Sequence, residues 1–121
     1  ANTQCQFYIG IEEEPDFQVV HKVLGRHGSN MKKIAEDTGS KLRLRGRGSG
    51  FKEGPRLEES SDPLMLCLSA PDVAAYHRAK ALVTELRQDV YRQHQQHFRR
   101  AGKLELNHSV QVHEGYREGS R

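Results

Sequence analysis

The chain lacks tryptophan altogether, and only 7% of its 121 residues are aromatic. A recognition surface built from a broad platform of aromatic rings is therefore excluded, and any apolar recognition surface must be aliphatic. The two cysteines, Cys5 and Cys67, lie far apart without C-x-x-C spacing, which argues against zinc and a disulfide framework and indicates reduced thiols in an intracellular protein. The sequence has no apolar run of about 18 residues and no signal-peptide pattern, so we expect no membrane span.

With 35% hydrophobic residues, a chain of 121 residues has enough apolar surface for one modest core. We therefore expect a single domain with tails. Because the chain begins Ala-Asn-Thr without a methionine, we expect it to be a piece of a longer protein.

Positive charge is concentrated in one part of the chain. Residues 22–56 contain ten basic and three acidic residues, a net charge of +7, whereas residues 1–21 carry −4 and residues 57–121 are balanced. A basic segment of this kind is typical of a nucleic-acid contact, and the alternative is an ordinary solvated face.

A glycine-bracketed turn, Gly25-Arg-His-Gly28, lies inside this basic segment and separates two helical patterns. Glycine at both corners allows a sharp turn and a close backbone approach to another molecule. Arg26 and His27 then lie at the tip, next to the start of the following helix, which together form a site for an anion such as phosphate. The alternative interpretation is a simple connection between two helices.

Hydrophobic periodicity predicts an α+β domain. The expected elements are a strand over 4–11, a helix over 17–24, a second helix capped by Ser29 or Asn30 and ending at Thr38-Gly39, a strand over 41–45, a long mobile loop over 46–63 and a strand over 64–68. A last helix opens with the capping box Ser69-Ala-Pro-Asp72, with proline in its first turn, and runs to about Gln93 or beyond. The strand over 41–45 alternates strictly, which places Leu42 and Leu44 inward and the three bases outward.

This order of elements around the turn resembles the type I KH (hnRNP K homology) domain. The residues that match the core pattern of that family are Val23, Leu24, Gly25, Gly28, Met31, Lys32, Ile34, Thr38, Gly39, Leu42 and Leu44. Within the family the chain is most similar to the enlarged KH domain of the branch-point-binding protein and the STAR proteins, because of Pro15-Asp16-Phe17, Arg45-Gly-Arg-Gly-Ser49 and the long loop that follows.

The resemblance implies a three-stranded antiparallel sheet with three helices on one face, and a groove that holds about four unpaired nucleotides of single-stranded RNA. It assigns the phosphate clamp to Gly25, Arg26, His27 and Gly28 with help from Lys32. Leu24, Met31 and Leu42 form the aliphatic floor for the bases, and Lys41, Arg43, Arg45 and Arg47 flank the opposite wall. Gln18 joins these RNA-binding residues at a place where the subclass has Asn.

Three departures from the subclass affect the choice of RNA sequence. Gln18 is longer than the usual Asn, His21 is bulkier than the usual Gly, and the turn has Arg26-His27 instead of Pro-Arg. A second hypothesis follows from these changes, in which the groove has degenerated and the domain is a protein-interaction scaffold.

Other chemistry finds little support in the sequence. His94 and His97 share a helical face, but no cysteine or carboxylate completes a metal site at ligand spacing, so we expect solvated histidines and no metal or other cofactor. No nucleophile motif is present, and we expect no enzyme.

We assign residues 1–96 to the KH domain and residues 97–121 to a tail that is either flexible or a small hairpin around Asn107-His108. We expect a monomer in an intracellular, nuclear setting, with other RNA-processing proteins as further partners.

Overall fold

The structure is a computed structural model that describes residues 2–102 and 116–118. Its elements in chain order are β1 (Thr3–Tyr8), α1 (Val19–Leu24), a 3₁₀ turn (Arg26–Gly28), α2 (Ser29–Thr38), β2 (Lys41–Arg45), β3 (Met65–Ala70), α3 (Val73–Arg100) and β4 (Tyr116–Glu118). The order predicted from the sequence is confirmed as far as α3.

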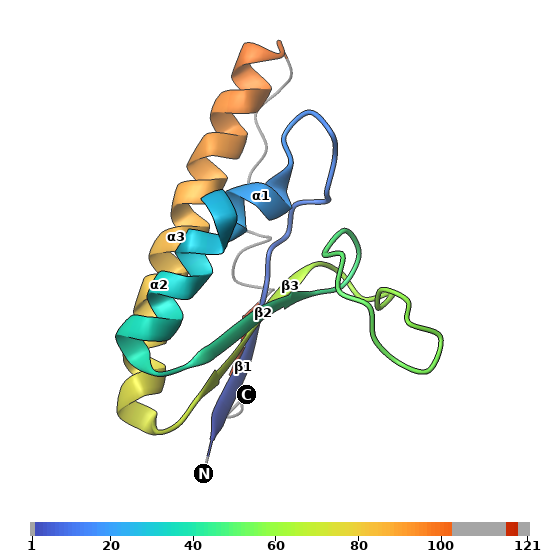
Figure 1. The fold of residues 1–121 in the computed structure, drawn as a ribbon. Helices are drawn as coiled ribbons and strands as arrows, with labels where there is room; N and C mark the ends of the chain where they lie inside the picture. The colour runs from blue at the N-terminus through green and yellow to red at the C-terminus, as the bar shows by residue number, and fades with distance from the viewer. Residues whose placement is uncertain (1, 103–115, 119–121) are drawn as a thin grey trace.

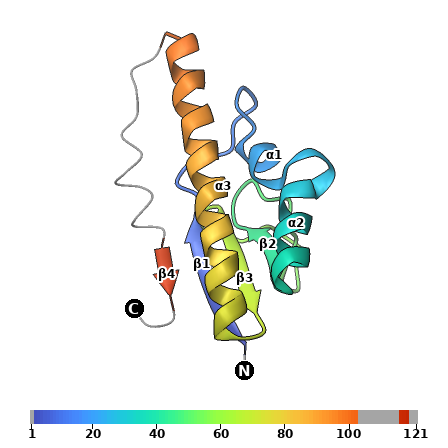
Figure 2. The ribbon, with the colours of Figure 1, turned by 90° about the vertical axis from the view of Figure 1, so that its left-hand side faces the viewer.

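The sheet is antiparallel with the order β2-β3-β1-β4. Figure 1 shows the sheet nearly edge-on, with α2 and α3 on its left side, and Figure 2 shows α3 running across the sheet. The predicted α+β fold with a three-stranded sheet and helices on one face is confirmed. The short strand β4, which pairs with residues 5–7 of β1, was not predicted.

The core lies between this sheet and the helices, and strand alternation builds it. In β2, Leu44 is buried and Leu42 is half-buried against the core. The basic residues that alternate with them, Lys41, Arg43 and Arg45, face the other side of the sheet. Phe7 and Leu66 are opposite each other in the register of β1 and β3, and both are fully buried. Burial of each such side chain contributes about 1.5–3 kcal/mol to folding.

Strand β1 ends at Tyr8 and not at the predicted Ile11, because Gly10 turns the chain with a φ of 79°. The chain beyond Tyr8 is held by α3. The Tyr91 hydroxyl donates to the Ile9 carbonyl at 2.7 Å, and Arg87 Nη2 donates to the Tyr8 carbonyl at 2.9 Å. Burial raises the pKa of Tyr91, so this hydroxyl stays protonated.

Helix α3 runs to Arg100, in agreement with a predicted end at Gln93 or beyond, but past the predicted domain boundary at residue 96. The predicted start at Ser69 was wrong, because Asp72 is the N-cap and its Oδ1 accepts from the Ala75 N–H at 2.8 Å. The last turns of α3 continue because they still pack on the rest of the fold: Phe17 lies edge-on to His94, with ring centroids 4.8 Å apart. Residues 97–100 thus belong to the domain's last helix, whereas the predicted hairpin around residues 107–108 lies outside the described residues. Within residues 2–102, no helix combines the length and apolar character that a membrane crossing needs.

The loop over residues 46–63, predicted to be mobile, is tied by polar contacts at its base. Arg47 N–H donates to the Asp62 carbonyl at 2.9 Å, and the Glu59 carboxylate accepts from the backbone N–H groups of Gly48 and Gly50. These two hydrogen bonds lower the pKa of Glu59. In Figure 1 the loop projects from the end of the sheet on the side away from the helices.

Candidate nucleic-acid interface

The turn between α1 and α2 requires glycine at its first corner. Gly25 has φ 78° and ψ 171°, a backbone region that essentially only glycine occupies. A Cβ atom at Gly25 would also lie 2.9 Å from the backbone nitrogen of Asn30 and 2.6 Å from its Cγ. Gly28 has φ 76° and ψ 16° but more room, since the nearest atom to its Cβ would be Lys32 Cε at 3.9 Å.

Asn30 is a structural residue of the turn that the sequence did not reveal. Its Nδ2 donates to the backbone carbonyls of Lys22 and Val23, each at 3.3 Å. These two hydrogen bonds give partners to carbonyls at the C-terminal end of α1. The prediction that Ser29 or Asn30 caps α2 was wrong, because Gly28 holds the N-cap position without a side-chain hydrogen bond. An asparagine just after a tight turn was the only signal, and it is equally typical of an N-cap.

The tip of the turn presents free positive charge. Arg26 and His27 are exposed, and His27 has φ 57°. Neither side chain, nor that of Lys32 one turn into α2, has a polar partner among the described residues. The first backbone N–H groups of α2 add the positive end of the helix dipole beside these side chains. This arrangement suits a phosphate group.

The apolar residues assigned to the floor are exposed to different degrees. Leu24 and Leu42 are half-buried and pack against the core, which leaves part of each side chain available to a ligand. Met31 is only 8% exposed, so it supports this surface from beneath. Because β2 is an edge strand among the described residues, one row of its backbone N–H and C=O groups faces outward beside Leu42.

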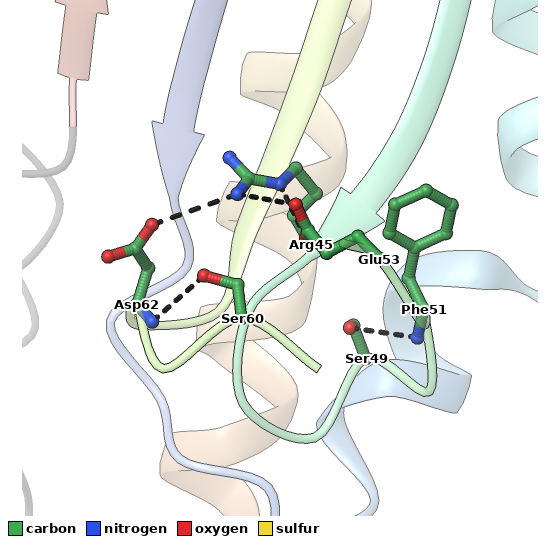
Figure 3. Close-up of polar contacts among 6 residues, drawn as sticks. All are labelled: Arg45, Ser49, Phe51, Glu53, Ser60 and Asp62. Carbon is green, nitrogen blue, oxygen red and sulfur yellow. Dashed lines mark hydrogen bonds and ion pairs between the residues drawn. The ribbon is translucent and has the colours of Figure 1, made fainter. Parts of the chain in front are cut away.

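The four basic residues assigned to the opposite wall of the groove divide into two pairs. Arg45 and Arg47 are engaged within the protein: Arg45 binds the Glu53 carboxylate through Nε and Nη2 at 2.8 and 2.9 Å, and Arg47 Nη2 donates to Glu12 at 3.0 Å. Figure 3 shows Arg45 at the end of β2, directed toward Glu53 and Asp62 of the loop. The hydrogen bond to Glu53 raises the pKa of Arg45 and lowers that of Glu53.

Lys41 and Arg43 are exposed and form no ion pair within the described residues. Both lie on the face of the sheet opposite the helices, because they alternate with Leu42 and Leu44. The structure therefore separates them from the residues of the turn, which the sequence grouped with them as one basic segment.

Gln18 lies just before α1 and has a φ of 59°, which is why the helix begins at Val19 and not at the predicted Phe17. Its Oε1 is 3.0 Å from Nδ1 of His21. The amide that would take the place of the subclass Asn is thus in contact with the residue that replaces the subclass Gly.

The prediction that His94 and His97 are solvated was wrong, because both pack against aromatic rings at the end of α3. His94 is buried, and the ring centroid of His97 is 5.5 Å from that of Phe17. Among the residues that the structure describes, no group of three His, Cys, Asp or Glu side chains could hold a metal ion.

Comparison with known proteins agrees with this architecture. Residues 13–88 match the family model described as "KHDC4/BBP-like, KH-domain type I". An uncharacterized protein of Schizosaccharomyces pombe is 31% identical over 87 residues, which cover 72% of this chain and 16% of that protein. Branchpoint-bridging protein of Yarrowia lipolytica is 32% identical over 91 residues, 71% of this chain and 15% of that protein, and its Candida glabrata counterpart is 38% identical over 76 residues, 57% and 16%.

The chain spans about a sixth of the length of these relatives. The matched residues 13–88 include the glycine turn, β2, the loop and most of α3. They make up more than half of the sequence, and they contain every site residue named above from Gln18 to Arg47. The chain belongs to the KHDC4/BBP-like family of type I KH domains.

Proposed function

We propose that this domain binds single-stranded RNA, with the glycine turn holding the sugar-phosphate backbone and the surface of Leu24 and Leu42 receiving the bases. The observation that carries the proposal is the turn itself. Its backbone requires Gly25, and it presents Arg26 and His27 without any polar partner in the described chain. Water solvates these exposed donors in the free protein, so both side chains are available to an anion.

Each part of this surface has a separate role. Arg26 and Lys32 neutralise phosphates, while the ring of His27 and the start of α2 add N–H donors. The aliphatic side chains provide a flat apolar surface for one face of a base, and the outward backbone groups of β2 are positioned to hydrogen-bond its Watson–Crick edge. Phosphate contacts supply much of the affinity, so binding weakens as the salt concentration rises.

The task of the whole protein follows from its relatives as a proposal. Two of them are named branchpoint-bridging protein, and this supports a role in pre-mRNA processing in the nucleus. The domain itself needs no catalytic residue for this role, and it acts as a binding module within a longer chain.

The test compares two charge-matched variants. Arg26→Asp/His27→Asp makes the tip of the turn negatively charged. His77→Asp/Arg78→Asp makes the same substitutions at exposed positions of α3. Each variant, once circular dichroism shows that it is folded, is titrated into a labelled pool of random short RNAs at low salt. We expect the turn variant to lose binding at least tenfold and the α3 variant to stay within about threefold of wild type. Equal losses in both variants would contradict a clamp at the turn.

One observation favours the alternative of a protein-interaction scaffold. Gln18 is 3.0 Å from His21, so the amide that would read a base already has a partner. The same titration separates the two functions, because a folded wild-type domain that binds no RNA at low salt would support the scaffold.

A further inference from the structure

The face of the sheet opposite the helices is hollowed. A hollow of about 640 Å³ lies across all three long strands, and its lining includes Gln4, Gln6, Lys41, Arg43, Cys67 and Ser69. These residues alternate with the core residues of the same strands, so they face away from the helices. Figure 1 shows that no helix covers this side of the sheet.

The charged residues that line this hollow are basic, and the acidic residues Glu53 and Asp62 of the loop reach its edge at Arg45. Lys41, Arg43 and Arg45 follow each other at every second position of β2, about 6.7 Å apart along the strand, and within residues 2–102 no acidic residue lines the hollow. Arg45 is neutralised by Glu53, but Lys41 and Arg43 have no ionic partner among the described residues. Lys41 and Arg43 thus lie on the edge strand of the hollow, and Ser69 and Cys67 of β3 separate them from the side-chain amides of Gln4 and Gln6 on β1.

An exposed aromatic ring stands at the rim. Phe51, in the loop over residues 46–63, is 37% exposed, and the Arg43 guanidinium lies 5.3 Å from its ring centroid. A stacked ring and guanidinium offer a flat surface to a base, and stacking of this kind tolerates any sequence.

These properties select one kind of occupant. The lining combines apolar side chains, among them Leu42 and Leu68, with amides and cationic side chains, so an apolar helix would leave charges buried and unpaired. A second copy of the same face would bring like charges together. A phosphodiester backbone, in contrast, matches a row of cations flanked by amide donors and an exposed ring.

We propose that the open face binds the backbone of an RNA strand that continues beyond the turn, passing over the edge strand β2 from the helix side of the sheet to its far side. This inference rests on the proposed function, because the turn delivers the strand. A short RNA is then held by the turn and the surface of Leu24 and Leu42, and a longer one also contacts Lys41, Arg43 and Phe51.

The experiment uses random-sequence RNA pools of four and of twelve nucleotides. Lys41→Gln/Arg43→Gln removes the two free cations, and Arg78→Gln/Arg100→Gln removes two exposed charges from α3 as a matched control. For the twelve-nucleotide pool we expect the open-face variant to bind severalfold more weakly and its log K against log salt slope to fall by about 1.4, because each single-strand phosphate contact contributes about 0.7. Its binding of the four-nucleotide pool should equal that of wild type, and the control should leave the slope unchanged.

Nuclear magnetic resonance of the wild type places the contacts. The side-chain amide signals of Gln4 and Gln6 should shift with the longer pool only, while the backbone signals of Gly25 and Gly28 should shift with both. Equal weakening of both pools by the open-face variant would overturn the proposal, as would unmoved glutamine signals or an equal effect of the control.

Failure of this inference is distinguishable from failure of the proposed function. If the glycine signals shift and the glutamine signals do not, the turn binds RNA and the open face does not. If the glycine signals stay in place with both pools, RNA binding at the turn itself is refuted. Shifts of the glutamines alone would refute the path across β2.

Discussion

Substitution of the two glycines of the turn by alanine should affect folding very unequally. Gly25 and Gly28 have similar positive φ values of 78° and 76°, so a view based on φ alone predicts equal costs. They differ in ψ and in space. Gly25 has a ψ of 171°, and its Cβ would meet Asn30, whereas Gly28 has a ψ of 16° and only ordinary contact around it.

The magnitudes follow from these differences. Alanine at Gly28 takes a left-handed helical conformation, which costs about 1 kcal/mol. Alanine at Gly25 enters a region that costs about 1–3 kcal/mol and also displaces Asn30. The backbone nitrogen of Asn30 cannot rotate away, so the whole residue must shift. The hydrogen bonds that its side-chain Nδ2 donates to the carbonyls of Lys22 and Val23 then weaken, at about 1 kcal/mol for each. The lower ends of these contributions sum to about 3 kcal/mol, and we expect at least this cost for Gly25→Ala.

Urea unfolding followed by circular dichroism measures both costs. We expect the midpoint to fall about three times further for Gly25→Ala than for Gly28→Ala at an unchanged m-value. The variant Asn30→Ala provides a check, since Gly25→Ala should cost less in its presence than in the wild type because two of the clashing atoms are gone. Equal destabilisation by the two glycine substitutions, or strict additivity with Asn30→Ala, would refute the reasoning.

Two further predictions concern the supports of the fold. Tyr91→Phe removes the buried hydrogen bond to the Ile9 carbonyl and should lower the free energy of unfolding in urea by about 1–2 kcal/mol without changing RNA affinity. An unchanged free energy of unfolding would contradict the role of α3 in holding the end of β1. Glu53→Gln breaks the ion pair with Arg45. Folding lowers the pKa of Glu53, so the ion pair stabilises the folded state above the ordinary glutamate pKa of about 4.3. This stabilisation is lost as the pH falls through the pKa of Glu53 in the folded state. The stability difference between wild type and Glu53→Gln should therefore shrink from pH 7 to pH 3, and a constant difference would show that the pair does not contribute.

The sequence was sufficient to predict the elements and the family because those depend on local patterns. Strict alternation in the residues of β2 placed Leu42 and Leu44 inward, and the glycine spacing located the turn. Element ends were less predictable, since they depend on single backbone positions and on distant packing. Gln18 in a left-handed conformation shortens α1, and the contact of Phe17 with His94 prolongs α3.

Polar partnerships were not predictable for a related reason. Arg47 pairs with Glu12, 35 residues earlier in the chain, and Arg45 pairs with a carboxylate from the loop. A periodicity tells which face of a strand a side chain occupies, but not which acid from another segment reaches it. Asn30 is a similar case, because its bonds to two carbonyls of α1 depend on the angle between two helices.

These pairings change what the charge of the basic segment means. Summed along the sequence, residues 22–56 carry +7, as if every base were available to one ligand. In the fold, ion pairs with Glu53 and Glu12 compensate the charges of Arg45 and Arg47. Basic side chains without an ion pair among the described residues then lie at the turn, around Arg26, and on the open face, at Lys41 and Arg43. Since β2 separates the two groups, a ligand long enough to touch both must cross that edge. The length dependence of the salt slope is therefore a more direct measure of this domain's RNA path than its affinity for any single oligonucleotide.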